Sequence, residues 1–351
     1  MRCNHLKKVA SYHEIANDMK YLIILIPILT TLSCDIQNHK PIDEIAKSTF
    51  EVKQISRGNN TPKIDITNDN MHVFLMALHY KIPVSEIANK LNWNSEATRN
   101  NIDLLIENKL LKKVDDKFIP SLGIFPTERG YLLTEKCALL AHEIADSIVS
   151  INDEINVLHD KTDISKTYSF HDLSFFYLSN ILLDNGQINN VEREFLGKER
   201  PSRNGSNYYL AILEKEEESI VEPYGIYGNQ VLLRNDSTVI AVYGNTRTEL
   251  NKGWQTYENK RIHSFSKNDF NIVVNEMPKS FLPTLIKILN KHKADFEKTY
   301  RELKFDEETS FEEFFIWWYH IIYTETTDIL IKQNLIKSPE NGLFYYELTF
   351  K

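Results

Sequence analysis

The sequence predicts an α+β protein, because helical spacing of apolar residues alternates with short strand-like segments along the chain. Apolar residues recur three to four positions apart in Met71–Tyr80 and again in Lys279–Leu303, which is typical of helices. Between these helices, residues 207–265 contain short apolar segments separated by glycine and asparagine turns, which is typical of strands. The chain has 351 residues, 42% of them hydrophobic, so we expect two folded units with real cores.

An apolar segment near the N-terminus ends at a cysteine. From Met19 the chain reads MKYLIILIPILTTLSC, in which Lys20 supplies a positive charge and Ser33 directly precedes Cys34. The apolar residues 21–29 are too few for a stable transmembrane helix, which favours a signal peptide. The segment resembles the signal peptide and the relaxed lipobox of Bacteroidetes lipoproteins. This resemblance implies cleavage before Cys34, a lipid on its thiol and anchorage of the mature chain to a membrane.

This interpretation also assigns a role to the other N-terminal residues. Residues 1–18 are charged and precede the apolar segment, so we interpret them as an over-extended start and residues 19–33 as the signal peptide. Residues 34–68 are polar and rich in turn formers, and we expect a tether that holds the folded part off the bilayer. The alternative interpretation makes residues 21–29 a short buried helix or strand of a cytoplasmic protein.

Three helices and a hairpin are expected in residues 69–160. After Met71–Tyr80 come a short helix, SEIANKL, with Ser85 as its N-cap and a longer helix with Ser95 as its N-cap. The alternating residues KKVDDKFIP then predict a β-hairpin that turns at Asp115–Asp116. Two helices joined by a tight turn and followed by a hairpin predict a winged helix-turn-helix domain.

The segment from about residue 70 to residue 158 resembles the winged-helix domain of multiple-antibiotic-resistance-type transcription regulators. In those proteins a phrase close to L-T-x-x-G leads from the wing into a long helix, and Pro126–Gly130 and Leu133–Lys136 are similar to it. In residues 138–158, apolar side chains recur three or four positions apart: Leu140, Ile144, Ile148, Ile151, Ile155 and Leu158. This pattern predicts a face that packs on another helix. The resemblance implies a homodimer through this helix, and the alternative is packing on the protein's own second domain.

Residues 165–351 are expected to form a second domain, in which helices flank a small antiparallel sheet. Residues 328–348 parallel residues 103–122, because each segment is a helix that ends in an apolar pair and lysine, followed by a charged turn and a strand. The parallel indicates either a second winged-helix-like half or the chance recurrence of a common helix-to-hairpin unit. The predicted fold is therefore a winged helix-turn-helix domain followed by a mixed domain.

The charge of the chain argues against nucleic acid as its partner. The full chain carries 41 Lys+Arg and 49 Asp+Glu. Residues 1–33 contain four of the former and two of the latter, so 37 against 47 remain, a net charge of −10. The helix that would read DNA bears Glu96, Arg99, Asp103 and Glu107, a net charge of −2. It therefore lacks the positive charge that binds phosphates.

No sequence pattern predicts catalysis or a cofactor. The HExxH, GxSxG, P-loop and dinucleotide-binding patterns are all absent from the sequence. With Cys3 before the predicted start and Cys34 lipidated, Cys137 has no second cysteine, which excludes a disulfide framework and a cysteine zinc site. We therefore expect no catalytic residue, no cofactor and no metal, and we interpret Cys137 as a buried apolar residue.

Residues 199–229 combine arginines, tyrosines and glycines in a turn-rich segment. We expect a recognition surface for a glycan or an acidic group there. Its candidate residues are Arg200, Arg203, Tyr208, Tyr209, Tyr224 and Tyr227. The alternative is ordinary turn structure with tyrosines at the edge of a core. For the aromatic run Trp317–His320 we favour the core, because four consecutive large side chains face all sides of a helix.

Together these features predict a non-enzymatic lipoprotein that is anchored by Cys34 on the periplasmic or outer-membrane side and acts through an unknown protein partner. The alternative is a cytoplasmic winged-helix transcription regulator with a C-terminal sensing domain. Lipid attachment to Cys34 distinguishes the two hypotheses, because a membrane-anchored chain outside the cytoplasm has no chromosome to bind.

Overall fold

The computed structural model describes residues 40–58, 60–215, 227–245 and 256–351, and His39–Lys351 form one compact unit. The predicted over-extended start, the signal peptide and Cys34 lie outside the described residues, as does Tyr224. The structure is 55% helical and 19% strand, with small sheets, which confirms the predicted α+β class.

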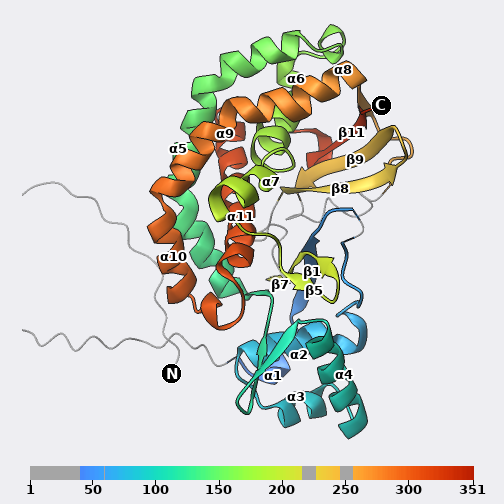
Figure 1. Ribbon diagram of the computed structural model, residues 1–351, viewed down its shortest axis with the longest axis vertical. Helices are drawn as coiled ribbons and strands as arrows, with labels where there is room; N and C mark the ends of the chain where they lie inside the picture. Colours follow the sequence, from blue (N-terminus) through green and yellow to red (C-terminus); the bar gives the residue numbers. More distant parts are fainter. Residues whose placement is uncertain (1–39, 59, 216–226, 246–255) are drawn as a thin grey trace, which may run out of the picture. The chain divides into compact units, whose positions relative to one another are not determined.

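The first part of the unit contains short helices and strands (Figure 1). In chain order these are α1 (Ile42–Ile45), β1 (Thr49–Ile55), η1 (Asn68–Asn70), α2 (Met71–His79), α3 (Val84–Lys90), α4 (Ser95–Glu107), β2 (Leu111–Val114), β3 (Lys117–Pro120) and β4 (Gly123–Phe125). The order of α2, α3, α4 and the hairpin β2–β3 agrees with the prediction. The predicted N-caps differ: Asn94 caps α4 by accepting a hydrogen bond from Ala97 N at 2.8 Å, and Pro83 precedes α3.

The rest of the unit contains longer helices and a second sheet. Its helices are α5 (Thr127–Asp160), η2 (Ile164–Lys166), α6 (Phe170–Ser174), η3 (Phe175–Ile181), α7 (Ile188–Val191), η4 (Glu192–Leu196), α8 (Lys267–Phe270), η6 (Asn271–Glu276), α9 (Met277–Lys291), α10 (Lys293–Glu302), η7 (Phe305–Glu307), α11 (Phe311–Lys332) and η8 (Glu340–Gly342). Its strands are β5 (Ser202–Arg203), β6 (Ser206–Asn207), β7 (Tyr209–Lys215), β8 (Tyr227–Arg234), β9 (Thr238–Asn245), β10 (Ile262–Phe265) and β11 (Leu343–Thr349). Figure 1 shows α5 and α11 side by side, and they pack along each other.

A three-stranded sheet, in the order β1–β7–β4, separates two apolar cores. β7 pairs antiparallel with β1 and parallel with β4. Alternate residues of β7 point to opposite sides: Tyr209, Ala211 and Leu213 belong to the larger core, and Leu210 and Ile212 belong to the smaller one. Both faces of β7 are therefore buried, which explains why YYLAILEK is a nearly continuous apolar run.

Residues 40–58 and 60–68 belong to the folded unit, so the predicted tether of residues 34–68 is wrong over that range. Ile45 and Ile66 are buried in the smaller core, and all seven residues of β1 pair with β7. The turn formers lie on either side of TFEVKQI, whose pairing with β7 makes it a strand rather than a tether. The rest of the predicted tether, residues 34–39, lies outside the described residues.

The larger core covers the apolar face of α5. Leu140, Ile144, Ile148 and Ile155 are at most 4% exposed, and α5 packs on α11 and α9. This face therefore packs on the chain's own helices, as the alternative interpretation expected. Since α5 lies inside the larger core, the predicted domain boundary between residues 160 and 165 does not separate the two cores.

A four-stranded sheet, in the order β10–β11–β9–β8, completes the larger core. β9 pairs antiparallel with β8 and with β11, but β10 runs parallel to β11. The sheet is therefore mixed, whereas the prediction was a purely antiparallel one. β11 follows α11, as the sequence parallel with residues 103–122 leads one to expect. However, β11 pairs with β9 and β10, whereas β2 pairs with its neighbour β3 in a hairpin.

Candidate functional site

The predicted recognition residues lie mostly inside the protein. Four of them are at most 5% exposed: Arg203, Tyr208, Tyr209 and Tyr227. The prediction of an exposed recognition surface is wrong for these four, because both faces of β7 are covered and Tyr227 at the start of β8 packs into the larger core. The alternative interpretation, tyrosines packed at a core, describes them correctly.

Arg203 forms a buried ion pair with Glu313 of α11. Its guanidinium donates to Glu313 Oε2 at 2.6 Å, to the Tyr208 carbonyl at 2.6 Å and to the Ser121 carbonyl at 2.8 Å. Glu313 Oε1 accepts a hydrogen bond from Leu210 N at 2.9 Å. The pair therefore connects β5, β7 and α11 through these bonds, while Arg203 Nε is among the buried atoms of the described residues that have no hydrogen-bond partner.

Arg200 also pairs with a carboxylate, but one of its own donors and the hydroxyl of the neighbouring Tyr209 are buried without partners. Its Nε and Nη2 atoms donate to the two carboxylate oxygens of Glu192 at 2.6 and 3.1 Å. Within the residues that the structure describes, Arg200 Nη1, the Tyr209 hydroxyl and Trp317 Nε1 are among the buried atoms that have no hydrogen-bond partner. The Arg200 guanidinium carbon lies 5.5 Å from the Tyr209 ring centroid. Because an unsatisfied buried donor lowers the free energy of unfolding, removing the Tyr209 hydroxyl should have an effect that unfolding experiments can measure.

Replacing Tyr209 with phenylalanine is expected to leave the free energy of unfolding unchanged or to raise it by up to about 1 kcal/mol, because the lost hydroxyl is buried without a partner. Tyr319→Phe is the matched control: the Tyr319 hydroxyl donates to the Leu183 carbonyl at 2.8 Å, and its loss should cost about 1 kcal/mol. Urea unfolding of both variants makes the comparison. Equal losses would show that the Tyr209 hydroxyl has a partner.

Glu308 is a buried carboxylate that connects the two cores. It bonds to His79 at the end of α2, and it accepts a hydrogen bond from Arg129 Nη1 of α5 at 2.6 Å. The Arg129 guanidinium carbon also lies 4.2 Å from the Phe305 ring centroid. Burial alone raises the pKa of Glu308, but the charges and hydrogen bonds of His79 and Arg129 outweigh it and lower the pKa to about 2. The carboxylate therefore stays charged and holds α2 against α5.

Asp184 lies in a polar cluster between η3, β8 and β11, and it is only 4% exposed. Asn229 Nδ2 donates to Asp184 Oδ2 at 2.8 Å and to Asn180 Oδ1 at 2.7 Å. Asn229 Oδ1 accepts from Asn180 Nδ2 at 3.0 Å and from the Tyr346 hydroxyl at 2.7 Å. We name these four residues, Asn180, Asp184, Asn229 and Tyr346, the Asn229 cluster.

The Asn229 cluster is the strongest candidate site, because its carboxyl group is strongly perturbed. Burial raises the pKa of Asp184 to about 7, although hydrogen bonds from Asn229 and Tyr323 act in the opposite direction. Perturbed carboxyl groups concentrate at functional sites. Close by, Ser179 Oγ bonds to two further hydroxyls, those of Tyr243 and Thr327, and a hydroxyl is not a base that activates a nucleophile. The chemistry that this arrangement supports is the binding and release of a proton.

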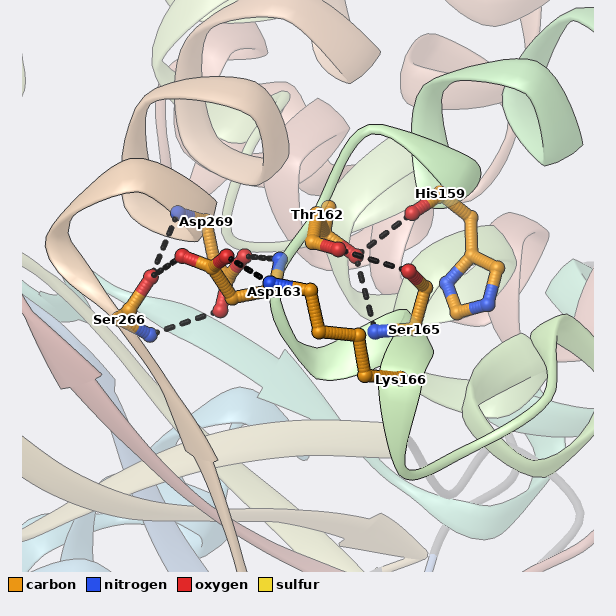
Figure 2. A network of polar contacts seen from close by, with 7 residues as sticks. All are labelled: His159, Thr162, Asp163, Ser165, Lys166, Ser266 and Asp269. Carbon is orange, nitrogen blue, oxygen red and sulfur yellow. Dashed lines mark hydrogen bonds and ion pairs between the residues drawn. The ribbon is translucent and has the colours of Figure 1, made fainter.

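A second polar network joins the loop after α5 to the start of α8, and Figure 2 shows its residues close together. Asp269 is buried and accepts hydrogen bonds from Ser266 N at 2.8 Å and from Asp163 N. Ser266 Oγ donates to Asp163 at 2.9 Å, and Lys166 Nζ pairs with Asp163 at 2.9 Å. Ser266 and Asp269 also form a capping box at the start of α8. These bonds fix one loop against one helix start, which is a structural role.

The interpretations of Cys137 and Trp317–His320 as core residues are confirmed. Cys137 is fully buried, and the four residues of the aromatic run are at most 4% exposed. Burial raises the pKa of the Cys137 thiol and so disfavours the reactive thiolate. Burial also lowers the pKa of His320 to about 4, and its Nδ1 lies 2.7 Å from the Ile316 carbonyl. His320 is therefore a neutral core residue with a hydrogen bond inside its own helix.

A pocket of about 460 Å³ lies beside β1, between Val52, Leu210 and the segment Thr61–Thr67. Its wall includes Ile64 and Asp65. Asp65 Oδ1 is already used, because it accepts hydrogen bonds from the backbone and side chain of Thr67 at 2.9 and 2.7 Å. Of the polar residues that line the pocket, Asp65 and Thr67 bond to each other, which leaves Gln54, Thr61 and Lys63 as the side chains that could meet a ligand.

No protein-family model matches the chain, and no curated protein or solved structure matches it either. Among residues 40–58, 60–215, 227–245 and 256–351, no three His, Cys, Asp or Glu side chains are grouped to hold a metal ion. Within the same ranges, no helix is both long and apolar enough to cross a membrane. The function is therefore inferred from the residues of this chain alone.

Proposed function

We propose that this protein is a non-enzymatic lipoprotein of the cell envelope, anchored by a lipid on Cys34 and acting through contacts with another protein. The observation that carries the proposal is the position of Cys34, directly after Ser33 at the end of an apolar segment that begins with Lys20. A cysteine in this place supplies the thiol that a lipid anchor needs. The anchor places the protein on the periplasmic or outer-membrane side.

In this proposal the folded unit stays close to the membrane. Since α1 begins at Ile42 and Lys40 already bonds to Glu214, the link from Cys34 has about six residues. Six fully extended residues span at most about 20 Å, which is far less than the predicted tether of residues 34–68 would reach. A partner that binds the unit is therefore a protein at, or reaching to, the membrane surface.

We further propose that α2–α4 and the hairpin β2–β3 form a winged-helix scaffold that contacts protein rather than DNA. The charged residues of α4 that are exposed are Glu96, Arg99, Asp103 and Glu107, a net charge of −2. This face repels phosphates. Ile106 of α4 and Val114 of the hairpin are 39% and 45% exposed, and apolar side chains among polar ones suit a protein contact.

Palmitate labelling tests the anchor. The wild type is expected to incorporate the label and to fractionate with membranes, whereas Cys34→Ala should lose the label and become soluble. Cys137→Ala is the matched control, because the buried Cys137 should not be acylated and its replacement should leave labelling intact. A globomycin-sensitive mobility shift would agree with the proposal. A native protein that starts upstream of residue 34, carries no acyl group and is soluble would overturn it.

The alternative, a cytoplasmic winged-helix regulator, is favoured by one observation, the order of α2, α3, α4 and the hairpin β2–β3. A gel-shift experiment with random duplex DNA at low salt separates the two functions. The proposed lipoprotein should give no shift, because its candidate reading helix is negatively charged. A shift that weakens steeply as salt is added would support the regulator.

A further inference from the structure

The amide group of Asn229 uses every hydrogen-bonding position that it has. Its two N–H groups donate to Asp184 and Asn180, and its oxygen accepts from Asn180 and Tyr346. Asn180 lies on η3, and Asp184 follows three residues after the end of that helix. Asn229 lies on β8, and Tyr346 lies on β11. This single side chain therefore fastens β8 to η3 and to β11, and one of its four bonds depends on the state of Asp184.

The described groups that face the Asn229 cluster are uncharged or acidic. α11 contributes the phenols of Tyr319 and Tyr323, and β9 contributes Tyr243; burial raises the pKa of each of these phenols well above its usual value. A further acid, Asp328 of α11, accepts a hydrogen bond from the Tyr227 hydroxyl at 2.7 Å. The Tyr323 hydroxyl favours the ionised form of Asp184 through a hydrogen bond, but none of these groups carries a positive charge that would offset a negative one on Asp184.

The other helices that contact η3 bring their charged residues elsewhere. Glu276 of η6 and Lys279 of α9 are exposed, whereas their neighbours Met277 and Pro278 are buried. On α5, His159 Nδ1 lies 3.2 Å from the hydroxyl of Tyr177, which precedes Asp184 by seven residues. Asp184 is thus a buried carboxyl group with no positively charged group among the described residues that face it. Its ionisation is therefore costly, because burying a charge without a partner is unfavourable.

We propose that the Asn229 cluster is a proton-controlled joint, in which β8 stays docked on η3 while Asp184 is protonated and separates from it when Asp184 ionises. This inference goes beyond the proposed function. An ionised carboxylate without a cation beside it lowers its energy by reaching water, and the proposed route runs past Asn229, the half-buried member of the cluster, which lies on β8 at the edge of the sheet. Opening that route breaks the hydrogen bonds by which Asn229 holds β8.

The raised pKa of Asp184, about 7, places the transition near neutral pH. The sign follows from linkage: the usual value is 3.8, so between about pH 4 and pH 7 the unfolded chain releases this proton while the folded chain keeps it. The contribution of Asp184 to stability therefore falls as the pH rises through this window. A side chain of the same shape that cannot ionise should remove the effect.

The first experiment measures urea unfolding of the full chain between pH 4.5 and 7.5, comparing wild type with Asp184→Asn. The unfolding constant of the wild type, divided by that of Asp184→Asn at the same pH, is expected to rise on the order of a hundredfold across the window. Asp236→Asn, the same replacement at an exposed site in the β8–β9 turn, should follow the wild type within about twofold. Parallel profiles for wild type and Asp184→Asn would overturn the proposal.

The second experiment locates the opening and needs no variant that folds poorly. Hydrogen exchange of the wild type, corrected for the intrinsic effect of pH, should show β8 amides losing roughly tenfold in protection between pH 6 and pH 8, while α5 amides stay protected. Infrared spectra should show a protonated carboxyl band at pH 6 that disappears by pH 8. Protection of β8 that does not change with pH, or a carboxyl already ionised at pH 6, would refute the proton-controlled joint.

Discussion

Arg203→Met is expected to lower the free energy of unfolding by about 3–5 kcal/mol, because it leaves the buried Glu313 carboxylate without its positive partner. Arg203 and Glu313 side chains are 4% and 2% exposed. The replacement also removes the donors to the carbonyls of Tyr208 and Ser121, which are then left with one bond fewer inside the protein. Urea unfolding at neutral pH measures the loss.

Two further variants show whether the charge causes this loss. Arg193→Met removes an arginine whose side chain is 63% exposed and paired with Glu194, so it should change stability by no more than about 0.5 kcal/mol. Arg203→Met combined with Glu313→Leu should cost less than Arg203→Met alone, because no unpaired charge stays buried. If Arg203→Met costs no more than Arg193→Met, the ion pair does not hold β5, β7 and α11 together.

Glu308→Gln is expected to lower the free energy of unfolding by about 3 kcal/mol at pH 7, because it removes the negative charge that pairs with both His79 and Arg129. The estimate follows from the fall in the Glu308 pKa from 4.5 to about 2, at about 1.4 kcal/mol for each pH unit. Since the folded-state pKa is lowered, the stabilisation is complete above about pH 4.5 and is lost as the pH falls towards 2. The difference between wild type and variant should shrink over the same range.

The neighbouring acid provides the control for this prediction. Glu307 has a 48% exposed side chain and lies 3.8 Å from Lys81, so Glu307→Gln should have little effect at any pH. Urea unfolding of wild type and both variants at several pH values between 2.5 and 7 separates the two sites. A cost for Glu308→Gln that is as large at pH 2.5 as at pH 7 would show that the packing of the side chain, and not its charge, stabilises the protein.

The local elements of the fold could be predicted from the sequence, but the pairing of distant strands could not. α2, α3, α4 and the hairpin β2–β3 depend on helical spacing and turns within a few residues, and these signals lie in the sequence. β1 and β7 pair with each other although they lie far apart in the sequence, and the residues of neither strand indicate which strand it pairs with. The polar turns around β1 therefore predict a tether, whereas its residues form a partly exposed strand that pairs with β7.

The prediction of an exposed recognition surface fails for a related reason. Arg203 and Tyr209 lie in a turn-rich segment, which favours exposure, but burial depends on what the rest of the chain places above that segment. The sequence does contain a signal for part of the Asn229 cluster. Asn180 and Asp184 are four residues apart in the apolar run SFFYLSNILLD, and so share one face of a buried helical segment. A pair of polar residues in such a run is a signal for a buried polar site.

The position of β7 between the two cores affects how the chain is made. β1 leaves the ribosome early, but the strand that covers its edge is synthesised only when residues 209–215 are reached. Until then, the nascent chain has α2 and the inner face of β1 without the wall that Leu210 and Ile212 provide. Closing such a long loop is slow, and exposed apolar faces are prone to aggregate in the meantime. Biosynthesis of this protein is therefore expected to depend on a chaperone that shields the N-terminal helices until translation passes β7.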